Sequence, residues 1–449
     1  MRPEPTSATI GSIHNLTMDS SHELAVNSGQ PIRSAPYPSW PTFGNEEIEA
    51  ASAVLRSGKV NYWTGEQGRL FEAEFAALTH CKYAVAVANG SVGLEMALYA
   101  LGIGAGDEVI VTSRSFIASA SSIVLRGATP VFADVDLDSQ NITGESIRQA
   151  LSSRTRAIIA VHLAGWPCDM DAVGEIATER GIAVIEDCAQ AHGAEFKGQP
   201  VGCLGDIASF SFCQDKIMST GGEGGMVVTN ERSLWEKVWS FKDHGKSHQL
   251  MNEPHDSAGY RWVHESIGTN LRMTEVQSAI GRVLARKLTQ SVEVRRRLAS
   301  QFTNEFTTIP GLRVTQPGPD FYHSYYKYYV FIRHDTLSSG WSRDRIVEAI
   351  RAEGVPCFAG SCSEIYLERA FAGSDFNYRR LPNAKELGET SLMFLVHPTL
   401  SDKDIGDACS AVRKVMTCAT GRSASTNWTR SNAQDVASAS MISRGNVPL

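Results

Sequence analysis

The feature that most constrains the fold of this chain is a regular alternation of short apolar runs with stretches of helical pattern. The runs are rich in Val, Ile and Ala and carry few charges, as expected for strands covered on both faces. Strands that alternate with helices predict an α/β fold, with a large, mostly parallel seven-stranded sheet and helices on both of its faces. The expected strands span residues 83–88, 108–112, 130–135, 157–162, 182–185, 207–212 and 226–229, and expected helices include 93–101, 144–151 and 170–180.

The pattern changes after about residue 270. A long helical stretch leads away from the sheet, an alternating strand follows at 325–333, and helices are expected at 343–353 and 402–415. These elements predict a smaller C-terminal α+β domain. Both ends of the chain lack apolar periodicity. We therefore expect four parts, which are a flexible N-terminal segment (1–35), a large domain (36–285), a small domain (286–417) and a disordered tail (418–449).

The composition argues against several classes of protein. Of the 449 residues, 42% are hydrophobic and 20% charged, the balance of a globular protein with a sizeable core. The net charge of −7 is spread out with no basic run, which argues against nucleic acid or an anionic membrane as partners. No apolar run approaches the ~20 residues that span a bilayer, and the first residues do not resemble a secretory signal. Nine cysteines without a C-x-x-C pair predict reduced thiols, a cytoplasmic location and no metal site.

The first of three motifs at strand ends is the turn at Gly90 and Ser91, which joins an apolar run to a helical stretch. Ligands of open parallel sheets bind beyond the carboxyl ends of the strands. A small turn that opens a helix offers free backbone N–H groups and the positive end of the helix dipole. It therefore predicts a phosphate site. The alternative is that Ser91 is only the N-cap of the helix.

The second motif is Asp187, which directly follows the apolar run at 182–185. A carboxylate at this position can pair with a protonated ring nitrogen of a ligand and keep it protonated. The alternative is that Asp187 caps a following helix.

The third motif is Lys216, which follows a buried run and precedes the glycine-rich stretch 221–225. A lysine in a desolvated cleft can become a nucleophile toward carbonyls, whereas most loop lysines are simply solvated. The combination of a phosphate turn, a carboxylate and a lysine at one sheet edge favours the functional interpretation of all three.

These motifs belong to longer segments with a family pattern. The stretch from about residue 37 to 417 resembles the DegT-type (DegT/StrS) sugar aminotransferases, pyridoxal-phosphate (PLP) dependent enzymes of fold type I. The most specific matching segments are YAVAVANGSVGLEMAL, VIEDCAQAHGA, SFSFCQDK and GGEGGMVVTN.

The resemblance implies a role for each matching residue. Lys216 matches the Schiff-base lysine, Asp187 the partner of the pyridine nitrogen, and Gln190 its neighbour on the hydroxyl side of the ring. The matches to phosphate contacts are Gly90, Ser91 and Ser211.

Two further matches come from more distant segments. Phe116 matches an aromatic residue stacked on the ring, and Asn270 matches an asparagine that reaches the phosphate of the neighbouring subunit, which implies a homodimer. The chain departs from the pattern at Ser113, where proline is usual, and at Cys188, where alanine is usual.

The reaction implied by the resemblance moves an amino group from an amino acid, expected to be glutamate, to a keto-sugar, expected to be linked to a nucleotide. One alternative is another fold type I reaction, such as that of a lyase or aldolase. The other is a regulatory protein that binds the cofactor without catalysis. The presence of both Lys216 and Asp187 favours an enzyme.

Overall fold

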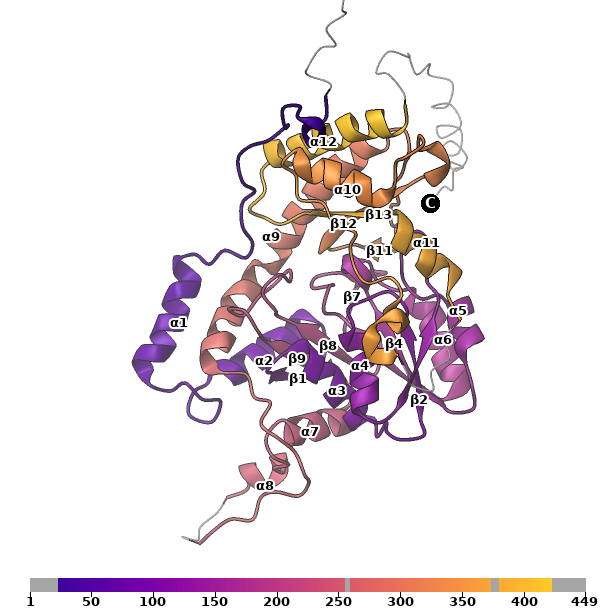
Figure 1. Ribbon diagram of the computed structural model, residues 1–449. Helices are drawn as coiled ribbons and strands as arrows, with labels where there is room; N and C mark the ends of the chain where they lie inside the picture. Colours follow the sequence, from indigo (N-terminus) through magenta and orange to yellow (C-terminus); the bar gives the residue numbers. More distant parts are fainter. Residues whose placement is uncertain (1–22, 255–258, 373–378, 422–449) are drawn as a thin grey trace, which may run out of the picture.

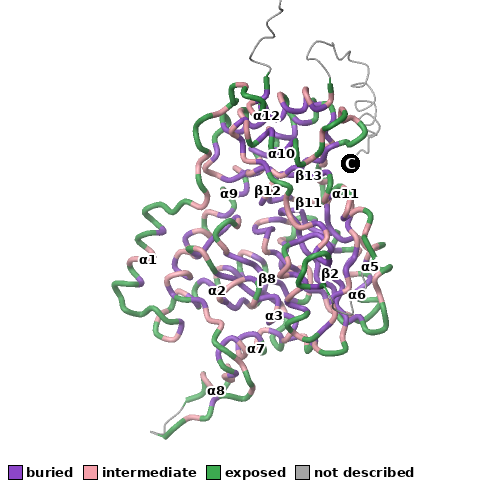
Figure 2. Tube along the Cα trace, in the orientation of Figure 1, coloured by how far each residue is buried: buried purple, intermediate pink, exposed green. Residues whose placement is uncertain are grey.

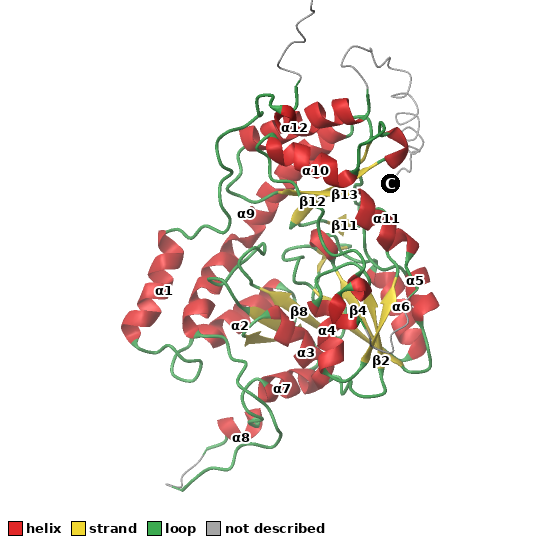
Figure 3. Cartoon of the chain, in the orientation of Figure 1, coloured by secondary structure: helices red, strands yellow, loops and turns green. Residues whose placement is uncertain are grey.

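The computed structural model describes residues 23–254, 259–372 and 379–421, and its larger part is built around one sheet (Figures 1 and 3). This sheet consists of β1 (Tyr83–Val87), β2 (Glu108–Thr112), β3 (Thr129–Ala133), β4 (Thr155–Val161), β5 (Ala183–Asp187), β8 (Ile207–Ser211) and β9 (Gly225–Thr229). The strand order is β1-β9-β8-β5-β4-β2-β3. Only β9 runs antiparallel to its neighbours. The prediction of a mostly parallel seven-stranded sheet is therefore confirmed.

Helices cover both faces of the sheet because successive strand residues point to opposite sides. Val109 and Val111 pack on the face under α3, α4 and α7, while Ile110 packs on the face under α5 and α6. Helices α2 and α9 cover that second face near β1, β8 and β9. The helices of this part are α1 (Asn45–Ser57), α2 (Gln67–Leu78), α3 (Gly90–Ala100), α4 (Ala118–Leu125), α5 (Gly144–Ala150), α6 (Met170–Arg180), α7 (Arg232–Phe241), α8 (His248–Asn252) and the start of α9 (Glu275–Phe306).

A smaller sheet, of order β10-β12-β13, forms the second layered part of the molecule. Its strands pack with α9, α10 and α12 around a separate core that includes Leu298, Phe302, Ile346 and Val412. A short sheet of β11, β6 and β7 connects the two parts. The bounds are β6 (Glu195–Phe196), β7 (Gln199–Pro200), β10 (Leu312–Arg313), β11 (Phe321–Tyr322), β12 (Lys327–Ile332), β13 (Ser391–Leu395), α10 (Arg343–Ala352), α11 (Pro382–Thr390) and α12 (Asp402–Ala419).

Helix α9 links the two parts of the molecule as one element of 32 residues. It runs from the large sheet up to the small one in Figure 1. Thr274 and Gln277 form a capping box at its start. The predicted boundary between residues 285 and 286 lies within this helix, so the division into domains stays a prediction.

Residues 23–35 pack on the small part of the molecule, and in this stretch the structure differs from the expected flexible N-terminal segment. The side chain of Leu24 is buried in its core. The backbone amides of Ala25 and Ile32 donate to the carboxylate of Glu353, at 2.9 and 3.1 Å. Arg33 forms an ion pair with Asp404 at 2.7 Å. Residues 1–22 and nearly all of the predicted tail lie outside the described residues.

Burial follows these layers, as Figure 2 shows. The strands are buried, whereas α1 and the projecting segment around α8 are largely exposed. Within the described parts of the chain, no helix is both long enough and apolar enough to cross a membrane.

Candidate active site

Three segments meet closely at one edge of the large sheet. The register pairs Gly225 at the start of β9 with Val87 at the end of β1 and with Ser211 at the end of β8. A Cβ on Gly90 would lie 2.6 Å from the Cβ of Ser211, and one on Gly225 would lie 2.5 Å from the carbonyl carbon of Asn89. The contact therefore requires glycine at both positions.

Helix α3 begins at this edge, and its first turn is open to an anion. The side chain of Asn89 accepts a hydrogen bond from the amide of Val92 at 3.0 Å, so Asn89 is the N-cap. The interpretation of Ser91 as the cap is therefore wrong, and the helix starts earlier than the expected residue 93 because of this cap. Helix geometry leaves the amides of Gly90 and Ser91 without an intrahelical acceptor, at the positive end of the dipole.

Asp187 ends β5 as a buried carboxylate. It accepts hydrogen bonds from the hydroxyl of Ser119 at 2.7 Å and from the amide of Ala189 at 3.1 Å. A turn, not a helix, follows it, so the alternative of a helix cap is wrong. Among the described residues, no basic side chain forms an ion pair with Asp187. A buried carboxylate without a cation is costly, so the site fits a ligand that brings a positive charge to this oxygen pair.

Lys216 lies on the loop after β8, between segments from the two parts of the molecule. Its carbonyl accepts a hydrogen bond from the indole N–H of Trp40 at 2.8 Å. Its amine lies 4.9 Å from the ring centroid of Tyr326. No carboxylate of the described chain lies within ion-pair distance of this amine. The amine therefore forms no ion pair with the described residues, and no local sequence pattern indicates either aromatic neighbour.

The remaining predicted residues lie on other segments. The side-chain carbonyl of Gln190 accepts a hydrogen bond from the amide of Ala164 at 2.9 Å, which fixes its orientation in the turn after β5. Phe116 precedes α4 and is 64% exposed, so its ring is free to stack on a ligand. Asn270 is exposed on a strand-like stretch that pairs with the end of β1. The roles of all three stay predictions.

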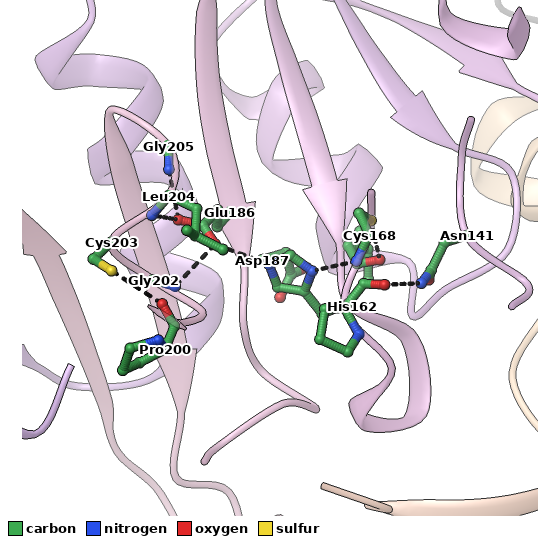
Figure 4. Close-up of polar contacts among 12 residues, drawn as sticks. Asn141, His162, Cys168, Glu186, Asp187, Pro200, Gly202, Cys203, Leu204 and Gly205 are labelled. Atoms are coloured by element: carbon green, nitrogen blue, oxygen red, sulfur yellow. Dashed lines mark hydrogen bonds and ion pairs between the residues drawn. The ribbon is translucent and has the colours of Figure 1, made fainter. Parts of the chain in front are cut away.

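A second polar cluster lies behind Asp187 and contains His162, Glu186 and Cys188, which are near enough to one another to suggest a metal site. His162 accepts from the amide of Cys168 at 2.9 Å through Nδ1, so its Nε2 carries the proton and donates to Glu186 at 3.0 Å. Burial, with the charges of Glu186 and Asp187, raises the pKa of the Cys188 thiol well above its ordinary value. Figure 4 shows Glu186 facing the other donors, which are the amides of Gly202, Leu204 and Gly205.

Because His162 and Glu186 bond each other and Glu186 also accepts from backbone amides, the cluster fits a structural role better than a metal centre. A cation would have to displace N–H groups that point at the carboxylate of Glu186. The cluster ties the loop at 202–205 to the ends of β4 and β5 and so supports the strand that carries Asp187.

The geometry of the sheet edge defines what it can hold. A phosphate fits the first turn of α3, a protonated ring nitrogen fits Asp187, and a carbonyl carbon fits the amine of Lys216. PLP carries all three groups, and the residues present fit it.

Comparison with known proteins agrees with this fit. The model of the DegT/DnrJ/EryC1/StrS aminotransferase family matches residues 41–413. The chain is similar to the crystal structure of an aminotransferase from Psychrobacter cryohalolentis, with 51% identity, a TM-score of 0.84, and coverage of 86% of this chain and 100% of that one. It is 33% identical to GDP-perosamine synthase of Escherichia coli O157:H7 over 83% of this chain and 96% of that protein.

A third similar protein is DesV of S. venezuelae, whose structure is in complex with a ketimine intermediate. It is 32% identical, with a TM-score of 0.74, over 83% of this chain and 94% of that one. The matches extend over both sheets and the whole sheet edge described above. The chain therefore belongs to the DegT/DnrJ/EryC1/StrS aminotransferase family, and its cofactor is pyridoxal phosphate.

Proposed function

We propose that this enzyme moves the amino group of glutamate to a keto-sugar linked to a nucleotide. The observation that carries the proposal is the buried carboxylate of Asp187 at the same sheet edge as the amine of Lys216, since neither forms an ion pair with any described residue. The nucleotide-linked acceptor is supported by the similar GDP-perosamine synthase, whose name contains a nucleotide-linked sugar.

The residues of the sheet edge would divide the work of holding the cofactor. Gly90, Ser91 and Ser211 would bind its phosphate, and Asp187 would hold the ring nitrogen in its protonated form. Bound in this way, PLP supplies an electrophilic carbonyl carbon and a ring that withdraws electrons. Phe116 would stack on the ring and Gln190 would contact its hydroxyl side.

Lys216 has two roles in this proposal. Its Nζ would hold the cofactor covalently until the amine of the donor displaces it. The freed amine would then take the proton from the α-carbon of the donor as a general base. In the second half of the reaction it would deliver a proton to the carbon of the keto-sugar that receives the amino group. Both roles suit an amine that forms no ion pair with a carboxylate of the described residues.

A homodimer in which Asn270 serves the neighbouring site is supported by the arm that follows α8. This arm extends away from the body of the molecule in Figure 1 and carries Tyr260, Trp262 and Ile267 with exposures of 72, 84 and 90%. The rings of Tyr260 and Trp262 lie against each other, 4.6 Å apart, and a contiguous exposed apolar patch indicates an interaction surface. We infer that they pack against a second copy and bring Asn270 to its cofactor.

Mixed dimers test this arrangement. We expect Lys216→Ala and Asn270→Ala chains to be weak or inactive alone. A mixed dimer would combine the intact Lys216 of one chain with the intact Asn270 of the other in one of its two sites, so activity would recover toward half of the wild-type value. If mixing restores nothing beyond the activity of the separate variants, Asn270 does not act across the interface.

The acceptor is tested with enzyme that has first been converted to its amine form by glutamate. Nucleotide-linked keto-sugars with different bases, and the same sugars without nucleotide, are then added one at a time. We expect one nucleotide-linked compound to exchange its carbonyl oxygen for an amine, as seen by mass spectrometry. Amination of the free sugars with no preference for the nucleotide would contradict the proposal.

A further inference from the structure

The starting observation is a second amine beside Lys216. Lys327 begins β12 of the small sheet, and its Nζ lies 4.5 Å from the ring centroid of Tyr326, while the Nζ of Lys216 lies 4.9 Å from the same centroid. The Lys327 side chain keeps 16% of its surface exposed, so a small ligand can touch it. Its neighbouring carboxylate, that of Asp215, is 3.8 Å away and also accepts the hydroxyl of Tyr326.

A third cation lies behind these two amines. Arg295 of α9 is buried, with its guanidinium 5.0 Å from the ring of Trp40, the residue that donates to the carbonyl of Lys216. One of its nitrogens donates to the carbonyl of Val396 at 2.7 Å. Its Nε and Nη2 have no hydrogen-bond partner among the described residues.

The charges do not balance in this corner of the site, which is formed by Lys216, Lys327, Arg295 and Asp215. Even without Lys216, the cations of Lys327 and Arg295 face one carboxylate among the described residues, that of Asp215, which is itself largely exposed to water. Buried cations are normally paired, because removing a charge from water is costly. The corner therefore has a positive field that favours one further anion.

The reaction determines where that anion must lie. The amine of the donor has to reach the carbon held by Lys216, and the α-carboxylate is attached to the carbon next to that amine. It must therefore lie within a few ångströms of the Lys216 nitrogen, where orientation by a fixed charge also speeds the reaction. The diphosphate of a nucleotide-linked sugar is separated from its reacting carbonyl by more of the sugar ring.

We propose that Lys327, with Arg295 behind it, binds the α-carboxylate of the amino donor. This inference rests on the proposed function and assigns its donor subsite. Lys327 makes the contact, and Arg295 acts as a positioning residue through its field. When the keto-sugar occupies the site and brings no carboxylate there, Lys327 can remain uncharged at modest cost, since burial lowers its pKa to about 8.

The test compares three donors in the half-reaction that bleaches the visible band of the bound cofactor. L-Glutamate and L-glutamine carry the α-carboxylate, whereas L-isoglutamine has an amide in its place and keeps the side-chain carboxylate. Lys327→Met should raise the half-saturating concentrations of glutamate and glutamine by about 10- to 100-fold, the loss of one hydrogen bond to a charged group. It should leave that of isoglutamine unchanged. The matched control is Lys385→Met, which replaces a half-exposed lysine paired with Glu389 on α11 and should change nothing.

Lys327→Arg adds a second measurement, the pH dependence of the half-saturating glutamate concentration, which a purely structural role of Lys327 would not change. Groups facing Lys327 are Asp215, Lys216, Arg295 and His397, and burial lowers the pKa of Lys327 to about 8. Burial also lowers the pKa of Arg295, to about 9, but Arg295 is the same in both enzymes and cancels from their ratio. The ratio of half-saturating glutamate concentration, wild type over arginine variant, should therefore rise as the pH increases above 8.

Several results would overturn the inference. The first is a Lys327→Met variant whose half-saturating glutamate concentration equals that of the wild type. The second is a rise in the half-saturating concentration of isoglutamine as large as that of glutamate. The third is weaker inhibition of the variant by inorganic pyrophosphate, with no change in the half-saturating concentration of any of the three donors. Each of these requires Lys327→Met to show the visible band of the bound cofactor, which establishes that it folds. A wild-type enzyme whose band no amino acid bleaches would instead refute the proposed function, and the subsite with it.

Discussion

Asp187→Asn is predicted to lower the activity strongly without lowering the stability of the cofactor-free protein. Asparagine has the same shape, and its oxygen can accept the hydrogen bond from the amide of Ala189, which measures 3.1 Å to the carboxylate. Its NH₂ group would donate to the hydroxyl of Ser119, which now donates to the carboxylate at 2.7 Å and can turn to accept. Asparagine carries no charge, however, and cannot hold a protonated ring nitrogen. The substitution thus removes the electrostatic role of the residue while it preserves the local packing.

The magnitude follows from the burial of Asp187, which is 5% exposed. Breaking a buried ion pair costs about 3–5 kcal/mol, and each ~1.4 kcal/mol is tenfold in rate, so turnover should fall by roughly 10²- to 10⁴-fold. Without cofactor the carboxylate has no cation, so its loss should leave the free energy of unfolding equal or up to about 2 kcal/mol higher. Turnover with glutamate and urea unfolding of the cofactor-free protein measure the two effects.

Asp243→Asn is the matched control, because this buried aspartate already has its cations. It forms ion pairs with Lys246 at 3.1 Å and with Arg272 at 2.5 Å. Its substitution should lower the free energy of unfolding by about 3–5 kcal/mol. The reasoning is refuted if Asp187→Asn destabilises the cofactor-free protein as much as this control does, or if it retains near-normal turnover.

Two further predictions concern buried groups outside the reaction. Burial lowers the pKa of His192 to about 3, of His323 to about 3 and of His397 to about 4, so the unfolded chain binds protons first as the pH falls below about 6.5. The free energy of unfolding should therefore decrease from pH 6.5 toward 4, by about 1.4 kcal/mol per pH unit for each histidine. Urea unfolding at pH 7, 6 and 5 measures this slope. A free energy of unfolding that does not change with pH would contradict the burial of these histidines. Glu186→Gln should cost about 3 kcal/mol, because an amide N–H would face backbone donors, and added Zn²⁺ should change neither the stability nor the activity of the wild type. Zinc-dependent stabilisation in thermal unfolding would revive the metal interpretation.

The strands could be predicted from the sequence because each depends on a local apolar run. The expected strand 226–229 appears as β9 (Gly225–Thr229), with a shift of one residue at its start. The motifs at strand ends could be predicted for the same reason, since a parallel sheet collects its carboxyl ends at one edge. Glycine at position 225 also belongs to this edge, but its need for close approach appears only once β1 and β8 are neighbours of β9.

What could not be predicted depends on contacts between distant residues. Ser119 lies 68 positions before Asp187, and Trp40 lies 176 positions before Lys216, so no local pattern indicates either contact. The packing of residues 23–35 could not be predicted either. One buried leucine and a few hydrogen bonds to Glu353 anchor this stretch, which is too little to produce an apolar period.

The central claim is that the amine of Lys216 holds PLP at this sheet edge and transfers it to an amino donor. The most direct test is the visible absorption spectrum of the purified protein with PLP, before and after glutamate, beside Lys216→Ala. We predict a band in the wild type that glutamate bleaches, and no equivalent band in the variant. A wild-type protein without a visible band, or a variant with the same band and the same response to glutamate, would contradict the account.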